Sequence, residues 1–209
     1  MGLGFHEKMI LIRYMNYDEA EKFIHNKLKT EIPHSLFYHS YGHTMDVFNA
    51  ANELAALESV SGDDLLLLKI AVLFHDSGFT VQSSNHEQIG CDIARESLPQ
   101  FNFTEEEIET ICGMIMATKI PQTPHNKLEE IICDADLDYL GRDDFESIAS
   151  ALYKELEIYH ILSDVNDWNR LQLKFLESHH YFTKSAINLR HDKKQKHLQK
   201  IKDIVNSIQ

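Results

Sequence analysis

The fold is decided by an apolar run at residues 65–74, LLLLKIAVLF, which ends directly in His75-Asp76. Only Lys69 interrupts the run, and the segment is far too short to cross a bilayer. The preceding Ser61-Gly62-Asp63-Asp64 is typical of a turn that caps a helix N-terminus. The run therefore predicts a buried helix. A carboxylate attached to so apolar a segment must be paired, hydrogen-bonded or bound to a metal ion.

Helical periodicity also dominates the sequence on both sides of this run. Capping residues, glycines and prolines divide it into further helices, which we expect at residues 17–29, 42–55, 86–98, 104–115, 127–140, 143–160, 164–181 and 183–208. Two-residue alternation shows only weak signs, in the first dozen residues. The sequence therefore predicts an all-α fold, a single-domain helical bundle over residues 1–209. We expect its core at about 38–145, with the C-terminal helices 146–209 packed on it.

The composition restricts the classes of partner. A chain of 209 residues, 43% hydrophobic and 25% charged, is typical of one globular domain. The formal net charge of −13 argues against partners such as nucleic acid or an anionic membrane, whose binding depends on Lys and Arg. Because the first residues lack the pattern of a signal peptide, we expect a cytoplasmic protein. The widely spaced Cys91, Cys112 and Cys133 are then expected to be buried, reduced thiols.

Two other polar segments can meet the His-Asp pair. Upstream, His39 and His43 lie one helical turn apart, so both rings face the same side of a helix. Downstream, Asp134 and Asp136 follow an apolar stretch, but they lie roughly 200° apart around a helix, so they are not expected to face the same ion. The residues alone leave the choice between these two aspartates open. Imidazole and carboxylate groups together suit a hard or borderline divalent cation.

The His-Asp pair itself places a condition on such a site. Neighbouring residues of a helix diverge by roughly 100°, so both members contact one ion only at a helix end or bend. Gly78 follows closely enough to favour such an end.

The order of these residues resembles the HD-domain superfamily of metal-dependent phosphohydrolases, over roughly residues 38–145. Residues 38–47 look like the Tyr-His-Asn-x-x-His-x-x-Asp-Val stretch of cyclic-nucleotide phosphodiesterases, with Ser40 in place of the asparagine. The Asp-Ala-Asp at 134–136 is similar to a segment of small bacterial HD hydrolases, which favours its second aspartate. The resemblance implies that the metal ligands are His43, His75, Asp76 and Asp136.

Further residues are candidates for supporting roles. The second histidine that the phosphodiesterases carry after the His-Asp pair is not at its usual interval, and His86-Glu87 is the nearest substitute. Glu87 would orient a ligand or a water molecule. His125 is another candidate ligand of a second ion, and Lys119 a candidate contact for substrate phosphate. Asp134 stays as the alternative to Asp136.

Such a site predicts hydrolysis of a small phosphoester, with a nucleotide or cyclic nucleotide as the favoured substrate. One or two divalent ions (Mn, Fe, Co, Ni or Zn, with Mg less suited) would activate water and polarise a phosphate oxygen. The catalytic candidates are Asp76, which would bridge to a second ion, and His39, which would protonate the leaving oxygen because its ordinary pKa is near neutrality. Packing at the start of a helix is the alternative role for His39.

Other functions stay open at this stage. The HD fold also carries oxidative chemistry in some diiron members, and a non-catalytic metal or nucleotide sensor would keep the same helical shell. A scaffold role would use the lysine-rich final helix, but we interpret that lysine cluster as a solvated face. Its members are Lys193, Lys194, Lys196, Lys200 and Lys202. The oligomeric state is open, and a homodimer is one option.

Overall fold

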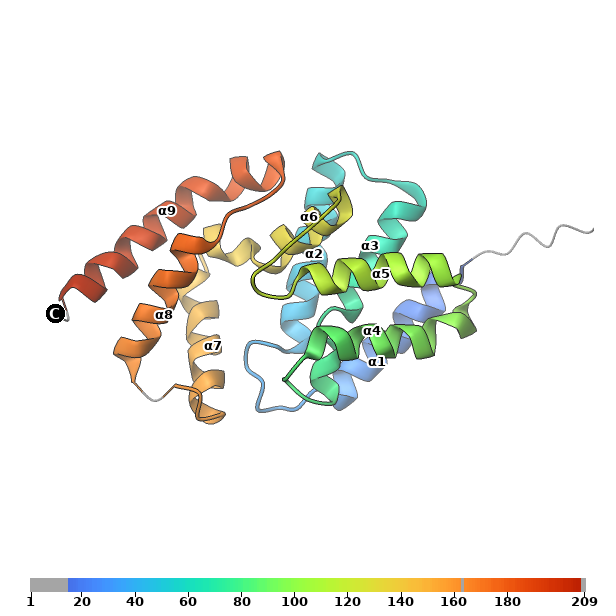
Figure 1. The fold of residues 1–209 in the computed structure, drawn as a ribbon, viewed down its shortest axis with the longest axis horizontal. Coiled ribbons are helices and arrows are strands. Elements are labelled where there is room, and N and C mark those ends of the chain that lie inside the picture. The colour runs from blue at the N-terminus through green and yellow to red at the C-terminus, as the bar shows by residue number, and fades with distance from the viewer. Residues whose placement is uncertain (1–14, 163, 208–209) are drawn as a thin grey trace, which may run out of the picture.

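The computed structural model describes residues 15–162 and 164–207, and within these ranges all regular structure is helical (Figure 1). This confirms the predicted all-α fold. The α-helices are α1 (Tyr17–Glu31), α2 (Tyr41–Leu57), α3 (Gly62–Phe74), α4 (His86–Ser97), α5 (Glu105–Ala117), α6 (Lys127–Asp136), α7 (Phe145–Ile158), α8 (Val165–Ser178) and α9 (Lys184–Ser207). Short 3-10 helices are η1 (Ser77–Thr80), η2 (Leu98–Phe101) and η3 (Asp138–Gly141).

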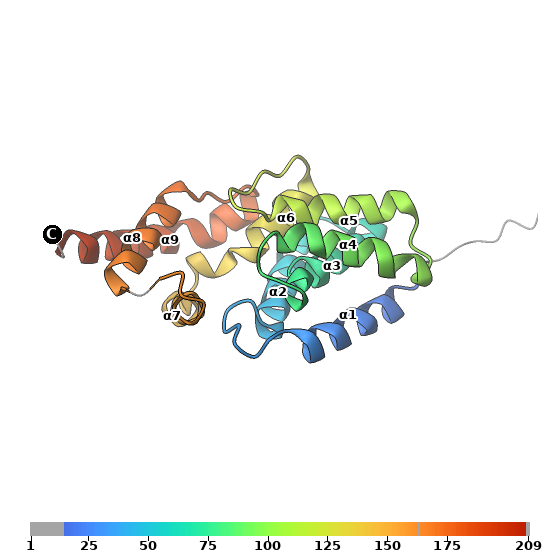
Figure 2. The same ribbon diagram turned by 60° about the horizontal axis from the view of Figure 1, so that its bottom comes forward.

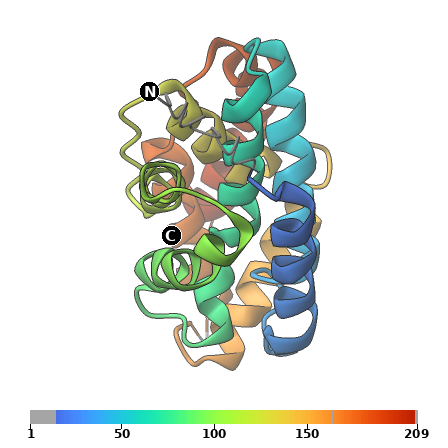
Figure 3. The same ribbon diagram turned by 90° about the vertical axis from the view of Figure 1, so that its right-hand side faces the viewer.

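Helix α3, which carries the apolar run, lies at the centre of the first six helices. In the view along the long axis of the molecule, α1 and α2 lie on one side of α3, and α4 and α5 lie on the other (Figure 3). Leu68, Ile70 and Leu73 of α3 have no exposed surface, as expected for a helix covered all round. We call the buried apolar side chains contributed mainly by α1–α6 the first core.

The last three helices form a separate group at one end of the molecule, visible in two orientations (Figures 1 and 2). Their apolar faces meet those of η3 around Trp168, Leu176 and Ile201. We call these buried side chains, contributed mainly by η3 and α7–α9, the second core. Helix α6 and η3 connect the two groups, so the acidic segment lies where the two cores meet.

Two predicted helix ends were wrong. The helix expected at 127–140 ends at Asp136 and continues as the separate turn η3. The helix expected to reach residue 181 ends at Ser178. After this second helix, the backbone N–H groups of Phe182 and Thr183 donate to the Asp134 carboxylate at 2.8 Å each, which holds residues 179–183 against α6 in a non-helical conformation.

The interpretation of the final lysine cluster as a solvated face was wrong for one member. Lys194 is only 2% exposed, and its ammonium group donates to the carbonyl oxygen of His179. Lys193 is half-buried and lies 2.5 Å from an Asp143 carboxylate oxygen. Lys196, Lys200 and Lys202 are exposed as expected.

The expectations drawn from composition can be compared with the described part of the chain. All three cysteines are free and buried, which agrees with the prediction of reduced core thiols. Across residues 15–162 and 164–207, no helix is long and apolar enough to cross a membrane.

Candidate metal centre

The His-Asp pair lies at a helix end, as the site required. His75 is the residue after the last turn of α3, and Asp76 immediately precedes η1. His75 Nδ1 lies 2.7 Å from the carbonyl oxygen of Val72. Because a carbonyl oxygen only accepts, Nδ1 carries a proton, which leaves Nε2 as the nitrogen that can bind an ion. The end of α3 therefore presents His75 with its ligating nitrogen already selected.

Helix α2 positions the second imidazole. Ser40 is the N-cap of α2, and its hydroxyl oxygen accepts from the backbone N–H of His43 at 3.4 Å. The Tyr38 ring packs against the His43 ring with centroids 4.5 Å apart. His43 Nε2 then lies 3.2 Å from Asp136 Oδ1 and 3.5 Å from Asp76 Oδ2. Ser40, which stands where the similar phosphodiesterase stretch has asparagine, therefore caps the helix and helps to orient this histidine.

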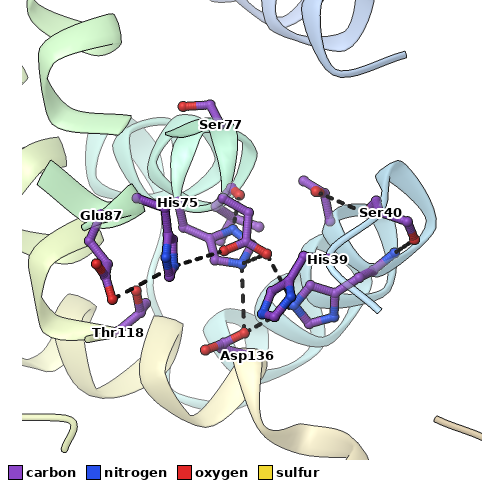
Figure 4. Close-up of polar contacts among 12 residues, drawn as sticks. His39, Ser40, His75, Ser77, Glu87, Thr118 and Asp136 are labelled. Carbon is purple, nitrogen blue, oxygen red and sulfur yellow. Dashed lines mark hydrogen bonds and ion pairs between the residues drawn. The ribbon is translucent and has the colours of Figure 1, made fainter. Parts of the chain in front are cut away.

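The third element is α6, which ends at Asp136. Asp136 Oδ1 is 3.6 Å from His75 Nε2, and Asp76 Oδ2 is 3.3 Å from the same nitrogen. One ligand atom each of His43, His75 and Asp136 lies within 4.8 Å of the others, which is the spacing of a metal site. Figure 4 shows Asp136 and His75 facing each other across this cluster.

The cluster has polar atoms that fit a cation and are not satisfied without one. His75 Nε2 and Asp76 Oδ2 are buried and have no hydrogen-bond partner in the described part of the chain. Burial alone would raise the pKa of Asp136, but the hydrogen bond with His43 and the adjacent His75 lower it to about 2. Burial opposes ionisation of Asp76 as well, yet the neighbouring His75 holds the pKa of Asp76 below its ordinary value. Both carboxylates are therefore ionised at neutral pH, the form that binds metal ions.

The other oxygen of Asp76 faces a second pair of groups. Its Oδ1 is 3.6 Å from His86 Nε2, which in turn is 3.6 Å from Glu87 Oε1. His86 Nδ1 lies 3.2 Å from the carbonyl oxygen of Ser83, so this ring also presents Nε2 to the cluster. Gly78 permits the approach, because a Cβ there would lie 2.0 Å from the carbonyl oxygen of His86. Asp76 thus stands between two sets of candidate ligands.

His39 lies beside the cluster and has a partner that the sequence did not reveal. Its Nδ1 is 2.5 Å from Glu155 Oε1, and the other oxygen of Glu155 accepts from the backbone N–H groups of Tyr38 and His39. Burial lowers the pKa of His39, but the hydrogen bond to Glu155 and the charges of Asp76 and Glu155 outweigh it and raise the pKa. The His39 ring also stacks on Phe79 with centroids 4.2 Å apart, which fixes its orientation.

Glu155 was missed because it belongs to a helix with several acidic residues, and nothing in its neighbours marks it. The available signal was its position three residues after Leu152 and directly before Leu156, on the apolar side of α7. Glu155 is 4% exposed, which for a carboxylate requires partners.

The remaining candidates lie outside the cluster. Asp134 is fully buried, and its carboxylate accepts three hydrogen bonds from Phe182 and Thr183, so it does not face the imidazoles. Lys119 is exposed and lies 3.5 Å from Asn85 Oδ1. His125 is exposed on the loop before α6.

A cavity of about 240 Å³ opens onto the cluster. His39, Asp76, His86 and Asp136 form its polar end, and Glu87 and Thr118 line the same side. In Figure 4, Glu87 and Thr118 approach from one side and His39 from the other, with Asp136 between them. A small molecule in this cavity can therefore reach both the candidate metal ligands and His39.

Comparison with known proteins agrees with this geometry. Residues 40–140 match the family model described as HD domain. The chain contains an HD domain. The match confirms the resemblance noted in the sequence, and it supports a metal-dependent hydrolase family. In this HD domain, the group formed by His43, His75 and Asp136 is able to hold such an ion.

A solved structure shares the fold. It is the crystal structure of a predicted HD superfamily hydrolase from an uncultured Thermotogales bacterium, with a TM-score of 0.59 and 19% sequence identity. The match covers 90% of this chain and 92% of that chain, so the C-terminal helices are part of the shared fold. No curated protein matches the chain.

Proposed function

We propose that this HD-domain protein hydrolyses a small phosphoester with the help of one or two divalent metal ions. The observation that carries the proposal is the convergence of two imidazoles and two ionised carboxylates at the polar end of a cavity. Two of the converging atoms, His75 Nε2 and Asp76 Oδ2, are buried without a hydrogen-bond partner among the described residues. Such atoms are costly unless a ligand satisfies them.

The residues that would hold the first ion are His43, His75, Asp76 and Asp136. A second ion would lie on the other side of Asp76, with His86 and Glu87 as its further neighbours. Mixed imidazole and carboxylate ligands suit Mn, Fe, Co, Ni or Zn better than Mg. When bound, a divalent ion supplies positive charge to the phosphoryl oxygens and lowers the pKa of a water molecule.

The proton that the leaving oxygen needs would come from His39. Its Nδ1 is held by Glu155, which leaves Nε2 as the nitrogen that can donate to a substrate. The raised pKa keeps the imidazolium populated near neutral pH, as a general acid requires. Glu155 therefore acts as a positioning residue for His39, in the way that a buried carboxylate orients a catalytic imidazole.

The test combines metal analysis with an assay of phosphate release. Freshly purified protein is analysed for bound metals and then incubated with phosphorylated metabolites and each candidate ion. We expect release of phosphate from wild type, loss of bound metal and activity in His75→Ala, and no change in His125→Ala, whose histidine is exposed and belongs neither to the cluster nor to the cavity lining. Metal binding without phosphate release from any ester would contradict the proposal and favour a sensor or an oxidative enzyme.

A further inference from the structure

We propose that the substrate is the phosphoester of an apolar alcohol, and that the cavity between the metal cluster and helices α7 and α8 binds its apolar group. The proposal rests on the phosphoester hydrolysis proposed above and names the class of substrate for that same site. It differs from the nucleotide expectation drawn from the sequence, because it follows from the walls of the cavity and not from the metal ligands.

The far walls of the cavity are apolar. Past the catalytic cluster, α7 contributes Leu152 and Leu156, α8 contributes Trp168, Phe175 and Leu176, and η3 contributes Leu140. These side chains belong to the second core, and on the sides that face away from the cavity they pack against one another. When an apolar group displaces water from apolar cavity walls, the free energy of binding becomes more favourable.

The apolar part of the cavity is continuous with the cluster. A molecule bound in the apolar part therefore extends to the candidate metal ligands. Asp76, Asp136, His39 and His86 line the same space as the leucines of α7. A group bound among the leucines therefore lies within reach of the groups that would attack and protonate a phosphoester. The occupant is best explained as the alcohol portion of the substrate, with its phosphoryl group at the polar end.

The positive charge that a nucleotide polyphosphate requires is missing from these walls. None of the described residues that line the cavity is a lysine or an arginine; Lys119, between the lining residues Thr118 and Ile120, is exposed, and its ammonium group lies 3.5 Å from Asn85 Oδ1. The nearby Arg142 is already paired with Asp46 and Asp144, at 2.9 Å and 2.7 Å. Arg190 is paired with Asp138 at 2.6 Å. Since phosphate groups are usually bound by such cations, one phosphoryl group at the metal ions is all that this site accommodates well.

The size of the cavity sets the size of the apolar group. Its volume of about 240 Å³ is below the range of roughly 300–1,000 Å³ that holds drug-sized ligands. Part of that volume lies at the polar end and is needed for the phosphoryl group. A short aliphatic chain or a single ring is therefore the group that fits.

The position of the single tryptophan makes binding directly measurable. Trp168 is the only tryptophan in the chain, lines the cavity and is 7% exposed. Its fluorescence can be titrated with n-alkyl phosphonates, which carry a phosphoryl group but cannot be hydrolysed as esters. The titration uses full-length protein loaded with Zn²⁺ and a series from methyl to octyl phosphonate, with AMP as the polar competitor.

We expect the dissociation constant to fall about three- to fourfold per added methylene, the ratio expected for burial of one CH₂, and to level off once the cavity is full. The kcat/KM values of the matching alkyl phosphates should rise in parallel. A dissociation constant that does not change with chain length, or tighter binding of AMP than of hexyl phosphonate, would overturn the proposal. If no ester is hydrolysed but phosphonate binding still tightens with length, the hydrolase function fails and the cavity assignment stands.

A matched pair of variants tests whether the preference for longer alkyl chains arises in the cavity. Leu171 and Leu189 are exposed to similar degrees, 44% and 41%, but only Leu171 lines the cavity. Leu171→Gln should reduce the preference for hexyl over methyl phosphonate by about threefold, because a partly buried leucine contact is replaced by an amide. Leu189→Gln should leave that preference unchanged. Equal effects of the two substitutions would contradict the assignment.

Discussion

The two cores of this molecule differ in how completely they are filled. The first core surrounds α3, whose residues Leu68, Ile70 and Leu73 have no exposed surface. The second core, between η3 and α7–α9, borders a cavity that opens onto the metal cluster. The cluster itself is attached to the first core through His43, His75 and Asp76. The filled core thus holds the candidate metal ligands in place, while in the proposed function the incompletely filled core would select the substrate.

The largest expected effect concerns the cluster at the boundary between the cores. Asp136→Asn should abolish metal binding and lower the rate of phosphate release by about 1,000-fold or more, because a neutral amide is a poor ligand and cannot balance a cation. Elemental analysis and a phosphate assay measure both effects.

Asp134→Asn is the matched control, since it makes the same change two residues earlier on the same helix. Asp134 accepts hydrogen bonds from Phe182 and Thr183, so we expect a loss of about 1–3 kcal/mol in the free energy of unfolding. Bound metal should remain. Loss of metal in this variant alone would show that the assignment of the two aspartates is reversed.

The two cores can be compared directly by truncating one leucine in each. Leu68→Ala should lower the free energy of unfolding by about 3–4 kcal/mol, because a fully buried side chain leaves a cavity behind. Leu152→Ala should cost about 1 kcal/mol, since this half-buried leucine already borders empty space. Urea unfolding measures both values. Equal losses would mean that the second core is as tightly packed as the first.

Removal of the metal should affect stability as well as activity. A ligand that binds only the folded state at 100 times its dissociation constant adds about 2.7 kcal/mol to the free energy of unfolding. A chelator should therefore lower the unfolding temperature of wild type, and re-addition of the ion should restore it. Asp136→Asn should show no such response, which separates loss of the ion from a general effect of the chelator.

The smallest expected effect concerns the positioning of His39 by Glu155. Glu155 helps to raise the pKa of His39, so the protonated acid persists to higher pH, and kcat/KM should fall only as pH rises through that raised pKa. In Glu155→Gln the pKa of His39 drops, so the decline should begin at lower pH and the rate at neutral pH should fall about tenfold. A pH profile of kcat/KM checks this. An unchanged alkaline limb would mean that His39 is not the acid.

The parts of the fold that local sequence determines were predictable. The apolar run at 65–74 could only form a covered helix, and the position of the His-Asp pair at its end followed from the divergence of neighbouring side chains. Asp136 and Asp134 were correctly expected to face different directions, although only tertiary structure shows what Asp134 contacts.

What the sequence did not reveal depends on contacts between distant segments. Glu155 lies 116 positions from His39, and no local pattern connects them. Lys194 looks like its neighbouring lysines until α9 packs against His179. The end of α8 was misplaced for the same reason, because one buried carboxylate binds a backbone segment almost fifty residues away. The cavity was also unpredictable, since leucines of three separate elements line it.

The close approach at Gly78 has a consequence for the stoichiometry of the centre. The residue has no side chain of its own, yet its backbone allows the first turn of α4 to bring His86 within 3.6 Å of Asp76. Even the methyl group of alanine would have to displace that turn, while His43, His75 and Asp136 belong to other elements and would keep their positions. In the proposed centre, the choice between a single ion and a pair would thus depend on a position that contributes no ligand atom.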